Sequence, residues 1–181
     1  MNTIFRNLID SKYIYSKHVL IRWKKTQAFI KKYDANSGLD IGDRTPFTEE
    51  LETFFNCSFD NTVVDLDEGK LKGKYDIVTA FEIIEHLYNP LHLLNEISNV
   101  LKKGGKLYLS TPKGKPQYLW SEHHFHEMSD KSLRALIERA GFSIIRTEEI
   151  RIQPLLFYFT GIRPILRFIF EKHLLMELIH Q

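Results

Sequence analysis

Three side chains in the middle of the sequence have the types and the spacing of a chemical site. Glu82, Glu85 and His86 are separated by three residues and then one, which places them on one face if this turn is helical. Carboxylate and imidazole groups together suit Mg²⁺, Mn²⁺ or Zn²⁺, and His123 or His124 is a candidate fourth ligand. Glu85, His86 and the cluster of His123, His124 and His126 are also candidates for a base that removes a proton, and the Glu85-His86 pair could equally be scaffolding through hydrogen bonds.

Two strand-like runs lead into polar residues that could contribute to the same site. Residues 75–81 are rich in β-branched and apolar residues and end at Phe81, next to Glu82. The shorter run 62–64 ends at Asp65. We interpret both as buried parallel strands, whose carboxyl ends would present these residues along one edge of a sheet.

Helices are expected between the strands. Thr45 and Pro46 are typical of a helix start, and Asn89 with Pro90 marks another. The predicted helices span 46–55, 90–101 and 129–140, and further strands are expected at 106–110 and 142–145. This alternation predicts an α/β fold with a mainly parallel sheet flanked by helices, and a ligand site at the carboxyl ends of its strands.

Length and composition indicate one domain in a reducing compartment. The chain has 181 residues, 43% hydrophobic and 27% charged, enough for a single sizeable core. Cys57 is the only cysteine, so no intrachain disulfide or multi-cysteine metal site is expected. The first residues do not resemble a signal peptide. We therefore expect a cytoplasmic protein.

The two ends differ from the middle of the chain. Residues 1–35 are predicted to form a helical cover, and the net charge is +7 over residues 1–33 but −7 over residues 34–150. A solvated helix face explains the basic segment better than a nucleic-acid, anionic-lipid or charged-substrate site does. No nucleic-acid partner is therefore expected, although salt-dependent RNA binding would indicate one.

Residues 151–181 are predicted to be an apolar helical tail. They contain no uncharged run of about 18 residues, which disfavours a membrane span. Three interpretations of the tail stay open. It could cap the domain, pair with a second copy in a homodimer, or lie on a membrane surface as a peripheral contact.

Several motifs occur in an order that resembles a known family. They are Leu39-Asp40-Ile41-Gly42, residues 75–87, Asn89-Pro90, residues 101–105 and Ser110-Thr111-Pro112. Together they resemble class I S-adenosylmethionine-dependent methyltransferases of the ubiquinone- and menaquinone-biosynthesis type. The resemblance covers about residues 38–149, and it implies a Rossmann-like methyltransferase domain over residues 36–150 with S-adenosylmethionine as cofactor.

The resemblance also implies roles for particular residues. Asp40 would order the loop that follows the first strand and could contact the amino group of the cofactor, and Gly42 would let the backbone approach the cofactor. Asp65 would accept hydrogen bonds from the ribose hydroxyls. Phe81 and Glu82 would line the cofactor beside its sulfonium.

The sequence departs from the family pattern at the glycine loop. Asp43 and Arg44 stand where further glycines are usual. Arg44 could clash with the methionine part of the cofactor or bind its carboxylate, and we favour accommodation. The altered loop therefore puts cofactor binding itself in question.

The second departure is one of length. Only 32 residues separate Gly42 from Tyr75, so one βα unit is expected to be trimmed or lost. Asp65 could then match either the ribose acid or the acid of the following strand. The final antiparallel strand is also not recognised after Ile150, so the fold is expected to be shortened.

Two functions follow. The first is O-methylation of a small or lipid-linked acceptor, with Glu85 and His86 as candidate catalytic residues. The alternative is a degenerate, non-catalytic methyltransferase fold that serves as a binding or assembly module. The Glu-x-x-Glu-His letters resemble the metal site of small-RNA 2′-O-methyltransferases and ubiquinone-pathway O-methyltransferases, but they recur in metal-free relatives. No metal ligand is therefore assigned from the sequence.

Overall fold

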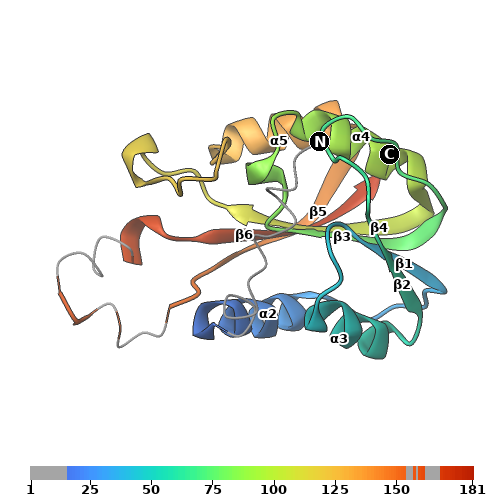
Figure 1. Cartoon of the computed structure of the whole chain (residues 1–181), viewed down its shortest axis with the longest axis horizontal. Helices are drawn as coiled ribbons and strands as arrows, with labels where there is room; N and C mark the ends of the chain where they lie inside the picture. Colours follow the sequence, from blue (N-terminus) through green and yellow to red (C-terminus); the bar gives the residue numbers. More distant parts are fainter. Residues whose placement is uncertain (1–15, 154–156, 158, 162–167) are drawn as a thin grey trace.

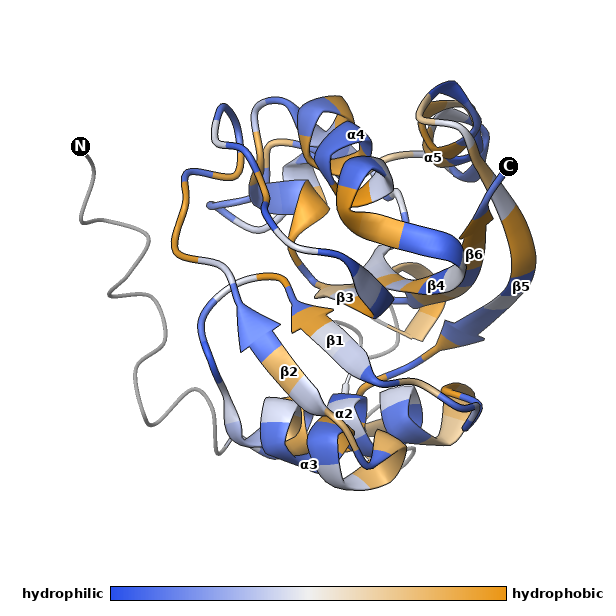
Figure 2. Ribbon diagram, turned by 90° about the vertical axis from the view of Figure 1, so that its right-hand side faces the viewer, coloured by the Kyte–Doolittle hydropathy of each residue, from blue (hydrophilic) through white to orange (hydrophobic). Residues whose placement is uncertain are grey.

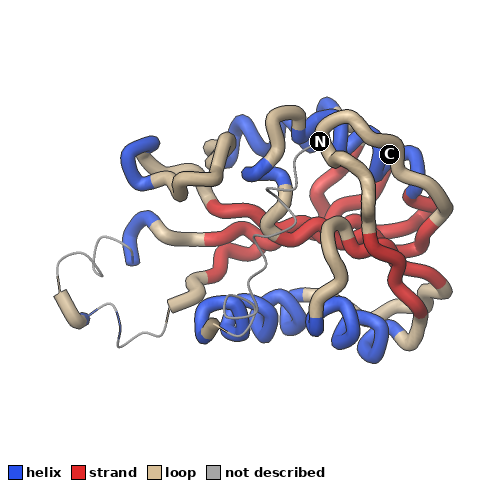
Figure 3. The backbone as a smooth tube through the Cα atoms, in the orientation of Figure 1, coloured by secondary structure: helices blue, strands red, loops and turns tan. Residues whose placement is uncertain are grey.

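A six-stranded sheet lies between two layers of helices (Figure 1). The computed structural model describes residues 16–153, 157, 159–161 and 168–181. The strands are β1 (Ser37–Asp40), β2 (Ser58–Asn61), β3 (Tyr75–Phe81), β4 (Leu101–Pro112), β5 (Phe142–Ile150) and β6 (His173–His180). Figure 3 shows them as one continuous layer.

The strand order is β2-β1-β3-β4-β6-β5. β2, β1, β3 and β4 run parallel to one another, whereas β6 is antiparallel to both of its neighbours. This topology confirms the predicted α/β fold with a mainly parallel sheet.

Helices cover both faces of the sheet. Figure 2 shows α2 (Lys17–Phe29) and α3 (Pro46–Phe55) on one face, and α4 (Pro90–Val100) and α5 (Asp130–Arg139) on the other. Short 3₁₀ turns are η1 (Ile84–His86) and η2 (Gln117–Leu119). The sheet separates two apolar cores because side chains of one strand alternate between its faces, as Ile77 and Val78 do.

The helix expected at 46–55 is confirmed, and its start has a clear cause. The Thr45 backbone N–H donates to the Thr48 hydroxyl at 3.1 Å, as in a capping box, and Pro46 occupies the first turn. Asn56 ends the helix in a left-handed conformation with φ 57°. The buried face of α3, including Leu51, packs against the sheet.

The strand predicted at 62–64 is wrong. β2 lies earlier, at Ser58–Asn61, and residues 62–74 contain no helix or strand. Val63 is 81% exposed, so this β-branched residue does not lie in a buried strand. Pairing with β1 decides the position of β2, because β1 itself ends at Asp40, opposite Asn61.

The expectation of a helical tail is wrong for residues 173–180, and the final strand is present. These residues form β6 between β4 and β5. Both faces of β6 are covered, so its sequence is almost continuously apolar and lacks the alternation that identifies a half-exposed strand. Between the two terminal histidines of the strand, Glu177 is the polar exception, and it pairs with Lys106 and Arg146 on the neighbouring strands.

Other expectations for the two ends lie outside the described residues. These are the helical pattern at residues 4–9 and the apolar and basic positions within 154–156, 158 and 162–167. Among the helices that are described, none is long and apolar enough to cross a bilayer.

The position of β6 inside the sheet can be tested with Leu178, which is completely buried. Leu178→Ala should lower the free energy of unfolding by about 2–5 kcal/mol, because it removes buried methyl groups and leaves a cavity. Urea denaturation measures this, with Leu20→Ala as the control because Leu20 is 45% exposed. Equal losses in the two variants would contradict a buried β6.

Candidate functional site

The carboxyl ends of the parallel strands and the beginning of β6 meet at one edge of the sheet. β6 is antiparallel to β4, so its first residue, His173, lies opposite the last residue of β4, Pro112. Ser110 and Thr111 precede Pro112 and point to opposite faces, as neighbours in a strand do. This edge therefore carries polar groups on both of its faces.

Asp40 at the end of β1 has an internal, structural position. Its side chain is buried and accepts hydrogen bonds from the hydroxyls of Thr48 and Thr79, each at 2.6 Å. Burial raises the pKa of Asp40 above its usual value, although both hydrogen bonds act to lower it. Asp40 thus joins β1 to α3 and β3 and fixes where the following loop begins.

The loop after β1 contains the glycine that the sequence singled out. Gly42 has φ +107°, a conformation that residues with a Cβ rarely adopt. Its backbone N–H donates to the Thr62 hydroxyl at 2.8 Å. Asn61 donates from its side-chain amide to the carbonyl oxygens of Asp40 and Gly42.

The two residues that replace glycines lie on the outside of this loop. Asp43 is exposed, and Arg44 is 46% exposed at its side chain. The Arg44 guanidinium forms an ion pair with Glu52 of α3 at 2.5 Å and contacts the Phe59 carbonyl oxygen at 3.4 Å. These contacts hold Arg44 along α3.

Asp65 does not directly follow a strand. It is exposed and begins a tight turn, in which its carbonyl oxygen accepts from the Gly69 N–H. The residues at the end of β2 are Asn61 and Thr62, which sequence reasoning missed. Neither is an acid, and the end of β2 was predicted in the wrong place, so no local pattern identified them.

Glu82, after β3, is held by partners from three elements. Its carboxylate accepts from the Ser110 hydroxyl at 2.8 Å and pairs with His173 at 2.8 Å and Arg22 at 3.2 Å. Burial acts to raise the Glu82 pKa, but the neighbouring His173 and Arg22 outweigh it and hold the pKa well below its usual range. Phe81 beside it packs against Phe47, with ring centroids 5.8 Å apart.

The backbone of Glu82 has a left-handed conformation, with φ 56°. Its N–H donates to the Ser110 carbonyl oxygen at 3.0 Å, which continues the pairing of β3 with β4 into the turn. A non-glycine residue in this conformation is strained, and such strain is common at functional turns. The sequence did not identify Arg22 and His173 as partners of Glu82, because they are distant from Glu82 in the chain and belong to no motif.

Glu85 has the opposite environment from Glu82. It is fully buried, and one carboxyl oxygen accepts from the Thr111 hydroxyl at 3.1 Å. The other oxygen, Oε1, has no hydrogen-bond partner among the described residues. Burial, followed by the nearby charge of Glu82, raises the Glu85 pKa well above its usual value.

Two histidines complete a compact group with Glu85. Ligand atoms of Glu85, His86 and His124 lie within 4.8 Å of one another. Glu82 is not part of this group, and His123 contributes its backbone carbonyl oxygen, which lies 2.8 Å from His86 Nδ1. Burial is the main cause that lowers the His86 pKa, which favours the neutral imidazole that binds metals.

Second contacts orient both imidazole rings. His124 Nδ1 lies 2.8 Å from a carboxylate oxygen of the buried Glu127, while His86 Nδ1 lies against the His123 carbonyl. With Nδ1 donating in each ring, Nε2 keeps its lone pair. A carboxylate or carbonyl behind the imidazole is the usual outer shell of a metal site. The donor set and the unpartnered Glu85 oxygen thus fit a divalent cation.

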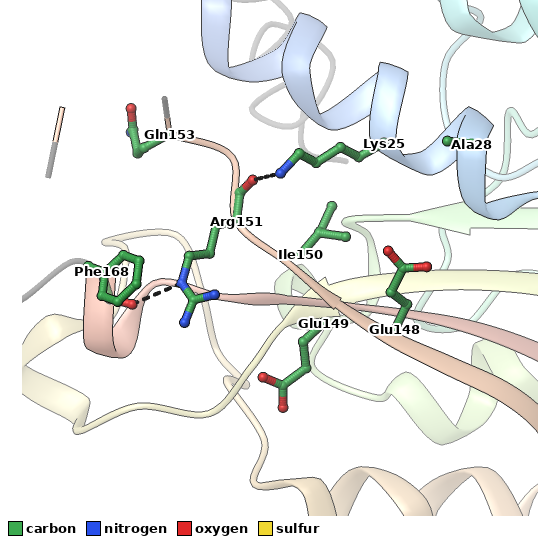
Figure 4. Close-up of a pocket in the computed structure, with 8 residues that line it drawn as sticks. All are labelled: Lys25, Ala28, Glu148, Glu149, Ile150, Arg151, Gln153 and Phe168. Atoms are coloured by element: carbon green, nitrogen blue, oxygen red, sulfur yellow. Dashed lines mark hydrogen bonds between the residues drawn. The ribbon is translucent and has the colours of Figure 1, made fainter. Parts of the chain in front are cut away.

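A cavity of about 540 Å³ lies elsewhere, between α2 and the end of β5 (Figure 4). Lys25 donates to the Arg151 carbonyl oxygen beside it, and Arg151 donates to the Phe168 carbonyl oxygen. None of the predicted site residues lines this cavity. The carboxyl edge of the sheet, and not this cavity, brings the predicted residues together.

Comparisons with known proteins agree with this architecture. The sequence profile of the methyltransferase domain family matches residues 18–147. The chain therefore belongs to this family, and its sheet is the Rossmann-like sheet of class I S-adenosylmethionine-dependent methyltransferases. One relative is the ubiquinone biosynthesis O-methyltransferase of Shewanella pealeana, 30% identical over 78 residues, which are 41% of this chain and 33% of that protein.

Solved structures share the fold at low identity. The N-methyltransferase NodS from Bradyrhizobium japonicum WM9, in complex with S-adenosyl-L-homocysteine, has a TM-score of 0.69 and 12% identity, and the match covers 97% of this chain and 95% of that one. The 1,6-didemethyltoxoflavin-N1-methyltransferase from Burkholderia thailandensis has a TM-score of 0.59 and 13% identity, covering 95% and 81%. In sequence, this chain aligns with only about a third of the length of the first curated relatives.

The raised pKa of Glu85 predicts a pH dependence of stability. The folded state holds this proton more tightly than the unfolded chain does, so stability falls as pH rises from about 4.3, the ordinary glutamate value, to the folded pKa. With a chelator present to remove metal ions, Glu85→Gln should abolish this pH dependence of stability. Its thermal unfolding midpoint should exceed that of wild type at pH 8 but not at pH 4. Exposed Glu122 provides the control, Glu122→Gln. A wild-type advantage at pH 8 would refute the buried, protonated Glu85.

Proposed function

We propose that this protein is an S-adenosylmethionine-dependent methyltransferase that methylates a hydroxyl group of a small or lipid-linked acceptor. The observation that carries the proposal is the grouping of Glu85, His86 and His124 at the carboxyl edge of a methyltransferase-family sheet. The cofactor would supply a methyl group on a positively charged sulfur. The protein would then have to position the acceptor oxygen and remove its proton.

The loop after β1 offers a backbone surface for the cofactor. Gly42 places no side chain beside the end of β1, and Asn61 and Thr62 hold the loop through its peptide groups. Phe81 would supply an apolar wall. The ion pair of Arg44 with Glu52 supports accommodation of the cofactor over a clash with it, which favours an enzyme over the degenerate alternative.

Cofactor binding can be tested by isothermal titration with S-adenosylmethionine. Gly42→Ala should weaken binding at least tenfold, because alanine is strained at φ +107° and relief of that strain would displace the loop backbone. Gly104→Ala is a matched control, since Gly104, in the first part of β4, has φ +80° with open space around it. No heat and no thermal shift with wild type at millimolar ligand would favour the non-catalytic module.

A divalent cation at Glu85, His86 and His124 is the finer part of the proposal. When bound, such a cation would polarise a hydroxyl oxygen of the acceptor. Glu127 and the His123 carbonyl would keep the two Nε2 atoms directed at the same point. The exposed Tyr88 ring, stacked on Phe125 at 4.1 Å beside this group, would offer an aromatic acceptor a surface.

Manganese titration followed by electron paramagnetic resonance tests the cation site without any acceptor. Wild type should bind one Mn²⁺, and His124→Gln should weaken this binding at least tenfold through loss of one imidazole ligand. His126→Gln is the control from the same loop, because its ring contacts the Tyr88 carbonyl oxygen and lies outside the group. Equal Mn²⁺ affinity in the two variants would rule out this site.

The segment between β5 and β6 supports an acceptor held near a membrane surface. Phe159, Phe168 and Ile169 are 75%, 37% and 53% exposed. The Arg151 guanidinium lies 4.2 Å from the centre of the Phe168 ring, which combines a positive charge with apolar surface. Peripheral contact with a bilayer would bring a lipid-linked acceptor to this end of the sheet.

A further inference from the structure

His173 lies at the functional edge of the sheet, although no sequence motif identified it. It is the first residue of β6 and pairs with Pro112 of β4 and Ile150 of β5. Its side chain lies on the same face as that of Ser110, because residues two apart in β4, and residues opposite each other, share a face. It is 6% exposed. His173 therefore lies in the edge where β3 and β4 end.

Glu82 orients the His173 ring. His173 Nδ1 lies 2.8 Å from Glu82 Oε2, while the Ser110 hydroxyl holds the other carboxylate oxygen at 2.8 Å. A carboxylate this close to Nδ1 favours the tautomer that carries its proton on Nδ1 and its lone pair on Nε2. Within the described part of the chain, Nε2 of His173 makes no hydrogen bond. An imidazole oriented in this way by a carboxylate has the arrangement of a general base.

The charged and polar groups around His173 come from several elements. Glu82 faces the ring from the turn after β3, and Arg22 of α2 lies 3.2 Å from the same carboxylate. From β4, Ser110 contributes a neutral hydroxyl. Glu149 of β5 forms an ion pair with Lys172, the residue before His173. Lys113 also pairs with Glu149.

We propose that His173 takes the proton from the acceptor hydroxyl during methyl transfer, and that Glu82 holds the ring for this step. The proposal rests on the proposed function. As the hydroxyl oxygen forms its bond to the methyl carbon, its proton passes to His173 Nε2. The carbon–sulfur bond breaks, its electron pair stays on sulfur, and the sulfonium becomes a neutral thioether. The imidazolium then returns its proton to water.

The tautomer and the location of the ring are measurable without an acceptor. Long-range ¹H–¹⁵N spectra of labelled protein should show Nδ1 protonated and Nε2 unprotonated at His173. Saturating S-adenosylhomocysteine should shift the Nε2 signal and leave that of His180, at the far end of β6, unchanged. A ring protonated at Nε2, or an unchanged signal in protein that titration shows to be saturated, would overturn the proposal.

Kinetics provide the second arm, with 3,4-dihydroxybenzoate as the hydroxyl probe. His173→Gln should lower kcat about 100-fold, the usual contribution of a general base, with little change in the KM for S-adenosylmethionine. It should also remove the fall in rate at low pH that protonation of the imidazole causes in wild type. His180→Gln, on the same strand, should change neither quantity.

Separate measurements distinguish a misfolded variant, a wrong proposed function and a wrong role for His173. Thermal unfolding establishes that His173→Gln folds, and added imidazole should restore part of the rate of His173→Gly. Unaltered kcat and pH profile in a folded His173→Gln would overturn the role of His173. If wild type fails to methylate the probe, methyl transfer to the hydroxyls of such acceptors is refuted. The tautomer of His173 and its response to S-adenosylhomocysteine then test the position of the ring by themselves.

Discussion

Two adjacent hydroxyls at the end of β4 organise the site. Ser110 donates to Glu82, and Thr111 donates to Glu85. Because neighbouring residues of a strand point to opposite faces, the two carboxyl groups are held on different sides of the same edge. The regular pairing of β3 with β4 through Phe81 and Ser110 is the constraint on which this separation depends.

The two faces give two carboxyl groups contrasting chemistry. His173 and Arg22 hold the pKa of Glu82 well below its usual range, whereas burial raises the pKa of Glu85, one of whose oxygens has no partner among the described residues. Environments that push two pKa values apart are how a protein assigns different roles to groups of one type. On the Glu82 face the arrangement suits proton removal by His173, and on the Glu85 face it suits a cation with His86 and His124.

Local signals predicted the parts of the fold that depend on nearby residues. The start of α3 at Thr45 and Pro46 and the end of β3 at Phe81 could be read from the sequence, because capping and continuous β-branched runs act within a few residues. The true extent of β2 depends on pairing with β1. β6 is buried on both faces, so its pattern did not distinguish strand from helix.

For the candidate site, too, the sequence predicted the residues of one local motif but not those that tertiary packing brings to it. Glu82, Glu85 and His86 stood in one motif, and the structure places Glu85 and His86 together with His124. Arg22 and His173 are brought to Glu82 only by the packing of α2 and the insertion of β6, so no spacing in the sequence revealed them. The residues that decide the charge of Glu82 are therefore tertiary.

The most direct test of the central claim is a crystal structure of the protein with S-adenosylhomocysteine. We expect the ligand across the carboxyl ends of β1, β2 and β3, with its methionine part beside Gly42 and its sulfur near Phe81 and Glu82. Ligand density in the cavity between α2 and β5 with none at Gly42, or no bound ligand at saturating concentration, would contradict it.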